Sequence, residues 1–278
     1  MRLSLIIPAR NEAKSLADLL PRIFALNLAD EVLVVNDGSS DDTAQVAKAA
    51  GARVIHNPYR MGNGAAIKNG ARHAQGDILL FMDADGQHDP ADIPRLLARL
   101  DEGFEMVIGA RSFASQASLG RGLANGIYNG LASYMTGQRV EDLTSGFRVV
   151  RAEKFRQFLY LLPNGFSYPT TITMAFFRAG YALSYLPIVA GKREGKSHIQ
   201  PLKDGVRFLL IIFRVGTLYS PLKLFAPVSL GFFLLALGYF LATWRFTNMS
   251  ALLFTTSMLV FLIGLVSEQI TALMYKDD

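Results

Sequence analysis

The 278-residue chain has no cysteine and only one tryptophan. The absence of cysteine excludes disulfides and thiolate-ligated metals, and it is compatible with a reducing cytoplasm. No internal repeat is evident, which excludes a repeat architecture. Met1 leads directly into an apolar segment, so we expect no signal peptide.

A strong excess of one charge is also lacking, because 28 Lys and Arg against 23 Asp and Glu give a net charge of +5. We do not expect nucleic acid as a partner, since the basic residues become denser near the carboxyl end, where the chain turns apolar. The length suffices for one domain of about 200 residues plus an appendage. We therefore expect a globular domain followed by an apolar C-terminal region.

Two carboxylates, Asp83 and Asp85, follow an apolar run from Asp77 to Phe81 that predicts a buried strand. Side chains at i and i+2 of an extended chain project to the same side, so both carboxylates can face one ligand. Hard oxygen ligands suit Mg²⁺ or Mn²⁺, which take further ligands from water and substrate phosphates. The pattern predicts a metal-held diphosphate, and a solvated Asp-Gly turn is the alternative.

Two further apolar segments, Leu3 to Pro8 and Glu31 to Val35, predict strands. Helical patterns follow them, from Ala13 to Phe24 and from Asp42 to Ala50, and this alternation predicts an α/β fold with a parallel, doubly wound sheet. Ligands of such sheets bind beyond the carboxyl ends of the strands. Asp37 lies at one such end, where an acidic residue can accept hydrogen bonds from a ribose or a base edge.

A glycine pair, Gly62 and Gly64, precedes a predicted helix that starts near Ala65. Glycines allow close backbone approach, and the N–H groups at a helix N-terminus can bind an anion. The segment is neither a Walker loop nor a dinucleotide fingerprint. By itself the pair identifies no ligand.

Five segments between Leu3 and about Ser197 carry a resemblance to a known family. They are Ile7–Glu12, Asn36–Asp41, Gly76–Pro90, Asp142–Arg148 and Arg193–Ser197. As a set they resemble glycosyltransferase family 2, and most closely its polyprenyl-phosphate glycosyltransferases of the dolichyl-phosphate mannose synthase type. The resemblance implies a GT-A fold, a Rossmann-like and mostly parallel sheet sandwiched by helices, over residues 1–200.

The resemblance also implies roles for individual residues. The nucleotide would be held by Pro8, Ala9, Arg10, Glu12, Asp37 and Asp83, to which the glycine pair adds Gly64. The Mg²⁺ or Mn²⁺ ligands would be Asp83, Asp85 and Gln87. The acceptor phosphate would contact Arg111, Arg121, Ser145, Arg148 and Arg193, with Lys196 and Ser197 on a loop that closes over the donor.

The implied reaction is displacement at the anomeric carbon of a nucleotide-activated hexose by a polyprenyl-phosphate oxygen. A phosphate monoester is already anionic near neutral pH, so no strong general base is needed. The catalytic carboxylates would be Asp83, Asp85 and Asp142. Asp142 would act as a base, orient an arginine or cap the turn at Leu143. The resemblance implies inversion of the anomeric configuration.

The chain departs from the mannose synthases after Asn164-Gly165-Phe166, where they commonly have an acidic residue and this chain has Ser167. The sugar therefore stays open among glucose, N-acetylhexosamine, uronic acid and modified pentose, and we favour a uridine nucleotide. His88 is either a neighbour or ligand of the metal, or a turn histidine that bonds backbone.

The C-terminal region contains two long apolar runs. Leu224 to Trp244 has 21 residues without a charge, and Ala251 to Tyr275 is interrupted only by Glu268. Lengths near 20 residues match the bilayer, so we predict membrane spans at about 224–244 and 251–273 within a region 223–278. A buried helical hairpin in a soluble domain is the alternative.

Basic residues precede the first span at Lys192, Arg193, Lys196, Lys203, Arg207, Arg214 and Lys223. By the positive-inside rule, we expect an integral protein of the inner membrane with a cytoplasmic catalytic domain and cytoplasmic termini. Residues 201–222 would form an amphipathic interfacial segment, or a third core-packing helix. The basic residues would hold the lipid phosphate or attract anionic lipids.

A membrane anchor favours a lipid acceptor over a soluble one. Two other functions compete: a processive polysaccharide synthase, and a non-enzymatic nucleotide-sugar sensor or flippase component. Such synthases use a Gln-x-x-Arg-Trp motif and more membrane helices, and the only tryptophan here lies in the hairpin. Two spans give a poor pathway for a polar headgroup.

The small residues Gly231, Ala236, Gly238 and Ser257 either support a homo-oligomer or face lipid.

Overall fold

The computed structural model describes residues 1–111, 119–165, 167–189, 191, 213, 216, 217 and 220–274. The chain forms two compact units. The first comprises Met1–Ser133 and Gln138–Ile199, and the second comprises Tyr134–Gly137 and Gln200–Asp278. Most of the expected interfacial segment, 201–222, lies outside the described residues.

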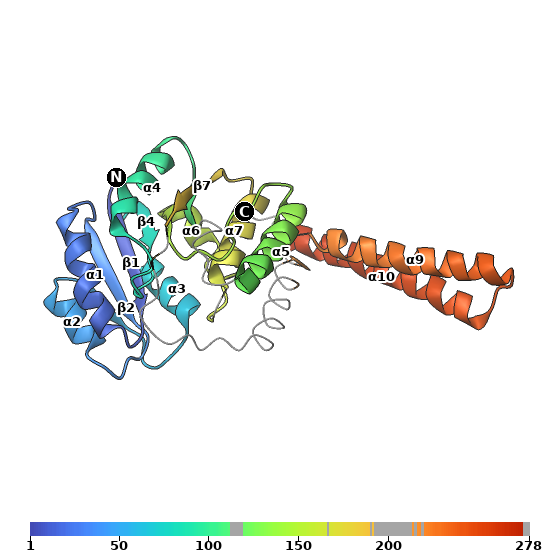
Figure 1. Ribbon diagram of the computed structural model, residues 1–278, viewed down its shortest axis with the longest axis horizontal. Coiled ribbons are helices and arrows are strands. Elements are labelled where there is room, and N and C mark those ends of the chain that lie inside the picture. Colours follow the sequence, from blue (N-terminus) through green and yellow to red (C-terminus); the bar gives the residue numbers. More distant parts are fainter. Residues whose placement is uncertain are drawn as a thin grey trace. The chain divides into compact units, whose positions relative to one another are not determined.

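A seven-stranded sheet with the order β3-β2-β1-β4-β6-β5-β7 forms the centre of the first unit (Figure 1). Among the described strands, β6 runs antiparallel to its neighbours and the other pairs are parallel. The strands are β1 (Leu3–Ala9), β2 (Glu31–Asn36), β3 (Arg53–His56), β4 (Ile78–Phe81), β5 (Met106–Arg111), β6 (Arg148–Arg151) and β7 (Leu183–Ile188). This mixed sheet confirms the predicted GT-A type of fold.

Helices alternate with the strands along the chain, as the sequence pattern predicts. In the first unit they are α1 (Ala13–Ala25), α2 (Thr43–Ala49), α3 (Asn63–His73), the short 3-10 turn η1 (Pro90–Asp92), α4 (Ile93–Asp101), α5 (Leu119–Thr136), α6 (Ala152–Gln157) and α7 (Tyr168–Arg178). The last three residues of α5 belong to the second unit, as do α9 (Pro221–Thr243) and α10 (Asn248–Met274).

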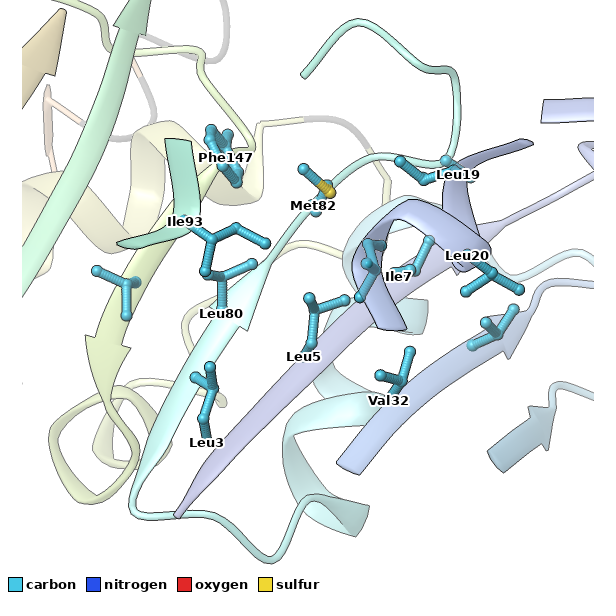
Figure 2. Close-up of a cluster of buried hydrophobic side chains, with 14 of the residues drawn as sticks. Leu3, Leu5, Ile7, Leu19, Leu20, Val32, Leu80, Met82, Ile93 and Phe147 are labelled. Carbon is cyan, nitrogen blue, oxygen red and sulfur yellow. The ribbon is translucent and has the colours of Figure 1, made fainter. Parts of the chain in front are cut away.

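One face of the sheet packs against α1 and α4. Alternate residues of β1, including Leu5 and Ile7, meet Leu20 of α1 and Leu80 of β4 in a buried apolar cluster (Figure 2). Burial of such side chains contributes about 1.5–3 kcal/mol each relative to exposure. The same cluster continues to Met82 and Phe147, so the core reaches the loops beyond the strand ends.

The opposite face is also buried, which explains why the central strands are continuous apolar runs. Gly70 of α3 lies so close to the sheet that an added Cβ would be 2.5 Å from Ile6 Cγ2. Farther along, Phe81 of β4 packs against Phe155 and Tyr168, with ring centroids 4.6 and 6.3 Å away. Two helical layers therefore enclose the sheet.

The carboxyl ends of β1, β2, β4 and β5 share one edge, because these strands are parallel to one another through the sheet. The antiparallel β6 starts at this edge, so the loop that precedes Arg148 reaches it from the other direction. The topology thus brings residues around positions 9, 37, 83, 111 and 145 to one side of the sheet.

The second unit contains a helical hairpin of α9 and α10, and both helices are long and apolar enough to cross a membrane. Their contact is close: a Cβ added to Gly264 would be 2.7 Å from Phe225 Cβ. Ser229 Oγ donates to Ser257 O at 2.8 Å, and Ser257 Oγ donates to Ser229 O at 2.9 Å. Glu268 accepts the N–H of Leu222 at 3.1 Å, so this charge caps the start of α9.

The four small residues considered for oligomer contacts divide into two pairs. Ala236 and Ser257 are buried within the hairpin, where they allow its own two helices to approach. A Cβ added to Gly231 or Gly238 meets no heavy atom within 4 Å in the described part of the chain. An oligomer contact therefore stays a prediction for the second pair.

Candidate active site

Asp83 and Asp85 lie in the turn that follows β4. The extended conformation expected here is wrong, because the strand ends at Phe81 and the chain bends at Gly86, whose φ is +71°. Asp85 Oδ1 accepts the N–H of Gln87 at 3.2 Å within this turn. Both carboxylates nevertheless lie at the sheet edge where ligands of α/β folds bind.

The turn offers a donor set that suits a hard divalent cation. Asp83, Asp85 and Gln87 are all partly exposed and present carboxylate and amide oxygens. The described residues contain no cluster of three or more His, Cys, Asp or Glu that could hold a metal. Two carboxylates leave coordination positions for water and phosphate oxygens, as Mg²⁺ sites usually do. The residues therefore fit Mg²⁺ or Mn²⁺ shared with a diphosphate.

His88 is buried behind this turn. Its ring stacks on Phe147 with centroids 4.9 Å apart, and its Nε2 lies 3.9 Å from Asp83 Oδ2. Its Nδ1 has no hydrogen-bond partner among the described residues. The expected backbone hydrogen bond is therefore not found there, and His88 packs against Asp83 from the core side.

Two other segments contact the carboxylate turn. A Cβ added to Gly146 would be 2.7 Å from Asp83 Oδ2, so only glycine fits against this carboxylate without displacement. Gly191, beyond β7, donates its N–H to Gln87 O at 2.8 Å. The turn after β4 is therefore enclosed by the chain before β6 and the chain after β7.

Arg111 ends β5 and forms a two-bond ion pair with Asp142. Its Nε and Nη2 lie 2.8 Å from Oδ2 and 3.0 Å from Oδ1 of the carboxylate. Asp142 Oδ1 also accepts the N–H groups of Thr144 and Ser145. Burial alone would raise the pKa of Asp142, but the hydrogen bond and charge of Arg111 outweigh it and the pKa is lowered.

The ion pair keeps Arg111 charged beside the carboxylate turn. Burial alone would lower the pKa of Arg111, but Asp142 and, more weakly, Asp83 and Asp85 raise it. Its side chain stays 26% exposed. Asp142 therefore orients an arginine and its own loop, which is one of the roles that the sequence left open.

Arg148 lies elsewhere than the resemblance implies. Its side chain is fully buried, and its guanidinium donates to Ser145 O, Pro169 O and Thr173 Oγ1. Burial lowers its pKa. The physical reason is that β6 is an interior strand whose first side chain points toward α7. This placement contradicts a direct contact with the acceptor phosphate.

The other residues predicted to bind the acceptor are only partly described. Ser145 is buried, and its Oγ has no hydrogen-bond partner in the described part of the chain. Arg121 belongs to α5, but its side chain is outside the described set. Arg193, Lys196 and Ser197 also lie outside the described residues.

Asp37, at the end of β2, is almost fully buried and accepts three hydrogen bonds. The donors are Asn57 Nδ2 at 2.7 Å and the N–H groups of Met61 and Gly62 at 2.8 Å each. The carboxylate therefore shapes the 57–62 segment at the sheet edge. A ribose or base would add to these protein contacts.

The end of β1 is joined to the segment after β2 by hydrogen bonds. Pro8 and Ala9 are the last residues of the strand, and Arg10 beyond them is exposed. The N–H of Glu12 donates to Thr43 Oγ1 at 2.9 Å, and the Glu12 carboxylate accepts a hydrogen bond from the Ser15 hydroxyl at 3.1 Å. These four residues, which belong to the set predicted to hold the nucleotide, thus border the same edge as Asp37.

The glycine pair before α3 has a structural use that the sequence did not show. The N–H groups of Gly64 and Ala65 donate to Gly165 O at 3.1 Å and Asn164 O at 2.9 Å. Backbone carbonyls thus occupy the helix N-terminus, which contradicts the expected anion site. A Cβ added to Gly64 would be 2.0 Å from Pro163 O, so the glycine admits this loop.

The sequence indicated no individual role for Tyr168, which is buried at the start of α7 and donates its hydroxyl proton to Gly146 O at 3.2 Å. Its contact crosses from α7 to the loop before β6, so no local pattern reveals it. A signal existed nearby, because α7 carries three threonines on an otherwise apolar helix. Buried hydroxyls require partners, and here the partners include Arg148.

Comparisons with known proteins identify the family of the chain. The model of glycosyl transferase family 2 matches residues 4–159, and the model of the GtrB C-terminal hairpin matches residues 220–273. The glycosyltransferase AglJ of Haloferax volcanii is 29% identical over 292 residues, covering 97% of this chain and 93% of AglJ.

Two further relatives cover less of this chain. The undecaprenyl-phosphate 4-deoxy-4-formamido-L-arabinose transferase of Klebsiella pneumoniae is 36% identical over 162 residues. That match covers 54% of this chain and 49% of the transferase, so it spans about half of the relative's length. Glucosyl-3-phosphoglycerate synthase from Mycobacterium tuberculosis, crystallised with Mn²⁺ and uridine-diphosphate-glucose, is 26% identical with a TM-score of 0.59, covering 76% of this chain and 77% of that one.

The carboxylate turn after β4 and the strands β2 to β6 lie within the residues that the family 2 model matches. The model covers more than half of the 278 residues. The chain therefore belongs to glycosyl transferase family 2.

Proposed function

We propose that this protein is a metal-dependent, inverting glycosyltransferase that moves a sugar from a nucleotide sugar to a polyprenyl phosphate. The observation that carries the proposal is the joining of two parts in one chain. A family 2 domain with a carboxylate turn after β4 is followed by a hairpin of the GtrB type. The first part suits a nucleotide sugar, and the second suits a lipid.

The donor would lie along the edge formed by the ends of β1, β2 and β4. Residues Pro8, Ala9, Arg10, Glu12 and Asp37 border the place for the nucleoside, and Asp83 and Asp85 border the diphosphate. The mycobacterial synthase with Mn²⁺ and uridine-diphosphate-glucose supports a uridine nucleotide and a divalent cation. Gly64 leaves this set, because its N–H is bonded to Gly165 O.

The acceptor would approach from the side of the Asp142–Arg148 loop. Arg111 is a partly exposed cation close to Asp83 and Asp85, so it suits a phosphate that meets the donor there. Arg121 and Arg193 complete the proposed phosphate contacts, and Lys196 and Ser197 form the proposed loop over the donor. Ser145 leaves the set of phosphate contacts together with Arg148, because both side chains are buried. The undecaprenyl-phosphate transferase supports a polyprenyl phosphate as the lipid.

The protein's own contribution to the reaction is orientation and charge. Arg111, held by Asp142, would hold the acceptor phosphate with one oxygen facing the anomeric carbon. A bound Mg²⁺ or Mn²⁺ would stabilise the charge of the departing nucleoside diphosphate. Asp142 takes no proton in this scheme, because its lowered pKa and its hydrogen bonds keep it ionised. Attack opposite to the leaving group inverts the anomeric carbon.

The hairpin would anchor the enzyme in the inner membrane with its catalytic domain on the cytoplasmic side. Its two helices have the length and composition of membrane spans, and large apolar side chains cover their outer faces. The Lys and Arg residues before the first span support this orientation. Residues 201–222 are proposed to lie along the headgroups.

A single incubation tests this function. The purified full-length protein in lipid nanodiscs is mixed with undecaprenyl phosphate, Mg²⁺ or Mn²⁺ and a panel of radiolabelled uridine and guanosine nucleotide sugars. We expect the label to move into the lipid fraction with one donor, and the transfer to cease with EDTA. The proposal would be contradicted if none of the donors transferred its label to the lipid, or if transfer continued fully in EDTA.

The matched variant is Asp85→Asn, which keeps the size of the side chain and removes one anionic oxygen ligand from the turn. We expect turnover to fall at least about 100-fold, in keeping with losses seen for groups that act on the transition state. Asp101→Asn removes an exposed carboxylate of α4 as the control. Near-normal turnover of the Asp85 variant would remove this residue from the metal site.

A further inference from the structure

Arg148 is an unusual buried cation, because it has no hydrogen-bonded carboxylate among the described residues. Its Nη1 donates to Pro169 O and Thr173 Oγ1 at 3.2 Å each, and its Nη2 donates to Ser145 O. The guanidinium carbon also lies 5.7 Å from the ring centroid of Tyr168. Burial of a charge without a hydrogen-bonded counter-ion costs free energy. We therefore expect Arg148 to have a role in addition to packing.

Arg148 and the neighbouring Tyr168 both bind backbone carbonyls of the loop before β6. Arg148 binds the carbonyl of Ser145, and the Tyr168 hydroxyl binds the carbonyl of Gly146 at 3.2 Å. Two successive carbonyls of one loop are thus held from within the core by side chains of β6 and α7. The same loop is held at its start by Asp142, which accepts the N–H groups of Thr144 and Ser145.

The outer side of this loop meets the proposed site. Gly146 lies against the Asp83 carboxylate, at 2.7 Å from an added Cβ. Ser145 Oγ is buried and has no hydrogen-bond partner in the part of the chain that the structure describes. The loop therefore lies between the carboxylate turn and the core, with its carbonyls directed inward to Arg148 and Tyr168.

We propose that Arg148 and Tyr168 are positioning residues for the acceptor phosphate. They hold the Ser145–Gly146 segment, and the N–H of Ser145 in turn binds the Asp142 carboxylate that orients Arg111. This inference rests on the proposed function. Neither residue touches the phosphate, because Arg148 is fully buried and Tyr168 is 1% exposed. Asp37, at the place proposed for the nucleoside, is held independently of this loop by Asn57, Met61 and Gly62. Loss of the clamp should therefore weaken use of the acceptor and spare binding of the nucleotide.

Tyr168→Phe is the test variant, because it removes one hydroxyl and keeps the ring that packs on Phe81. Tyr181→Phe is the matched control. Tyr181 belongs to the same unit and packs on Phe158 and Phe176, but its hydroxyl donates to Gln157 Oε1 at 2.7 Å, away from the loop. Both variants lose one hydroxyl hydrogen bond and keep an aromatic ring.

The first readout is steady-state transfer to undecaprenyl phosphate in nanodiscs, together with the Kd of uridine diphosphate by calorimetry. We expect Tyr168→Phe to lower kcat/KM for the lipid about 3- to 10-fold, the size of one lost hydrogen bond, and to leave the Kd of uridine diphosphate unchanged. Tyr181→Phe should leave both values unchanged. Equal losses in the two variants, or a Kd that rises in parallel with the loss of turnover, would overturn the proposal.

The second readout does not depend on turnover. Hydrogen–deuterium exchange of the peptide that contains Thr144 and Ser145 should be faster in Tyr168→Phe than in the unaltered protein, and unchanged in Tyr181→Phe. Unchanged exchange in both variants would overturn the clamp. If the unaltered protein transfers no sugar to the lipid, the proposed function fails, and the exchange measurement still decides whether the two residues hold the loop.

Discussion

At the scale of single residues, the carboxylates of the site differ in their burial and in the hydrogen bonds that hold them. Asp142 accepts hydrogen bonds from Arg111 and from the N–H groups of Thr144 and Ser145. A carboxylate with so many donors is a weak base, because hydrogen bonds to the charged form favour that form. Asp83 is different, since its side chain is 34% exposed and can meet a cation.

Asp142→Asn should lower stability in a pH-dependent manner. The folded pKa of Asp142 is lowered, so its contribution is fully present above its unfolded pKa of about 3.9 and is lost as pH falls through the lower folded value. Breaking a buried ion pair costs about 3–5 kcal/mol, so we expect the Tm at pH 7 to fall by about 6–20 °C. Thermal unfolding in detergent measures this loss.

The control for that measurement is the Tm of both proteins measured over a series of pH values. The difference in Tm between Asp142→Asn and the unaltered protein should shrink below about pH 4, because Asp142 is protonated there in the unfolded chain and still ionised in the folded protein. An exposed pair, Arg22 and Asp89, provides the comparison, and Asp89→Asn should change Tm by little. A difference in Tm that stays constant from pH 7 to pH 3 would contradict the role of the Asp142 charge.

The residues of the site were predictable to the extent that they follow parallel strands. Asp37, Asp83 and Arg111 lie at one edge of the sheet because parallel strands end there, and the order of apolar runs along the sequence reveals those ends. The location of Arg148 was not predictable from the sequence. It depends on the antiparallel pairing of β6 between β4 and β5, which brings residues distant in the chain together.

At the scale of elements, α3 illustrates how a helix terminus can have a partner within the protein. Its first N–H groups donate to Asn164 O and Gly165 O, and Lys68 Nζ, farther along the helix, donates to Leu162 O at 3.0 Å. Burial is the main cause of the lowered pKa of Lys68. The helix therefore holds the segment that leads into α7, where the sequence departs from the mannose synthases.

Gly64→Ala should disrupt this contact. An added Cβ would be 2.0 Å from Pro163 O, which is backbone and cannot move aside cheaply. We expect about 2–3 kcal/mol of destabilisation, within the range for overpacked sites, and a fall in Tm of about 4–12 °C. Thermal unfolding of the full-length protein in detergent gives the measurement.

Gly130→Ala is the matched control for a glycine in a helix. Gly130 lies in α5, and a Cβ added there meets no heavy atom within 4 Å among the described residues. This substitution should leave Tm unchanged or raise it, since alanine has the higher helix propensity. If Gly64→Ala behaved in the same way, the close approach of the 163–165 segment would be wrong.

The elements themselves were largely visible in the sequence. The helix predicted from Ala13 to Phe24 is α1 at Ala13–Ala25, and the strand predicted from Leu3 to Pro8 is β1 at Leu3–Ala9. Apolar periodicity sets these elements, and it is a local property. The use of Gly62 and Gly64 was not visible, because it requires knowing which distant loop packs on the helix.

At the scale of the whole molecule, one chain joins a catalytic unit to an apolar hairpin. The outer faces of α9 and α10 expose many large apolar side chains, and soluble proteins rarely expose such a surface. A membrane would cover it. Tethering to the membrane would also raise the effective concentration of a lipid acceptor near the catalytic unit, without any added contact in the site.

The hairpin should therefore be needed for the lipid substrate and not for the nucleotide. Leu234 and Leu259 lie near the middle of α9 and α10, and their side chains are 56% and 54% exposed. An arginine near the bilayer centre costs about 3 kcal/mol, so the double variant Leu234→Arg/Leu259→Arg should resist carbonate extraction far less than the unaltered protein. Its Kd for uridine diphosphate, measured by calorimetry in detergent, should be unchanged.

Transfer assays separate anchoring from catalysis in the same double variant. Transfer to undecaprenyl phosphate in vesicles should fall at least about 10-fold, while transfer to a short, water-soluble prenyl phosphate in detergent should persist, because that acceptor reaches the site without a membrane. Met249→Arg, at the first turn of α10, is the control, since a cation at a helix end can extend to the headgroups. Equal losses with both acceptors would mean that the substitutions damage the catalytic unit, and unchanged transfer in vesicles would show that the lipid is reached without the hairpin.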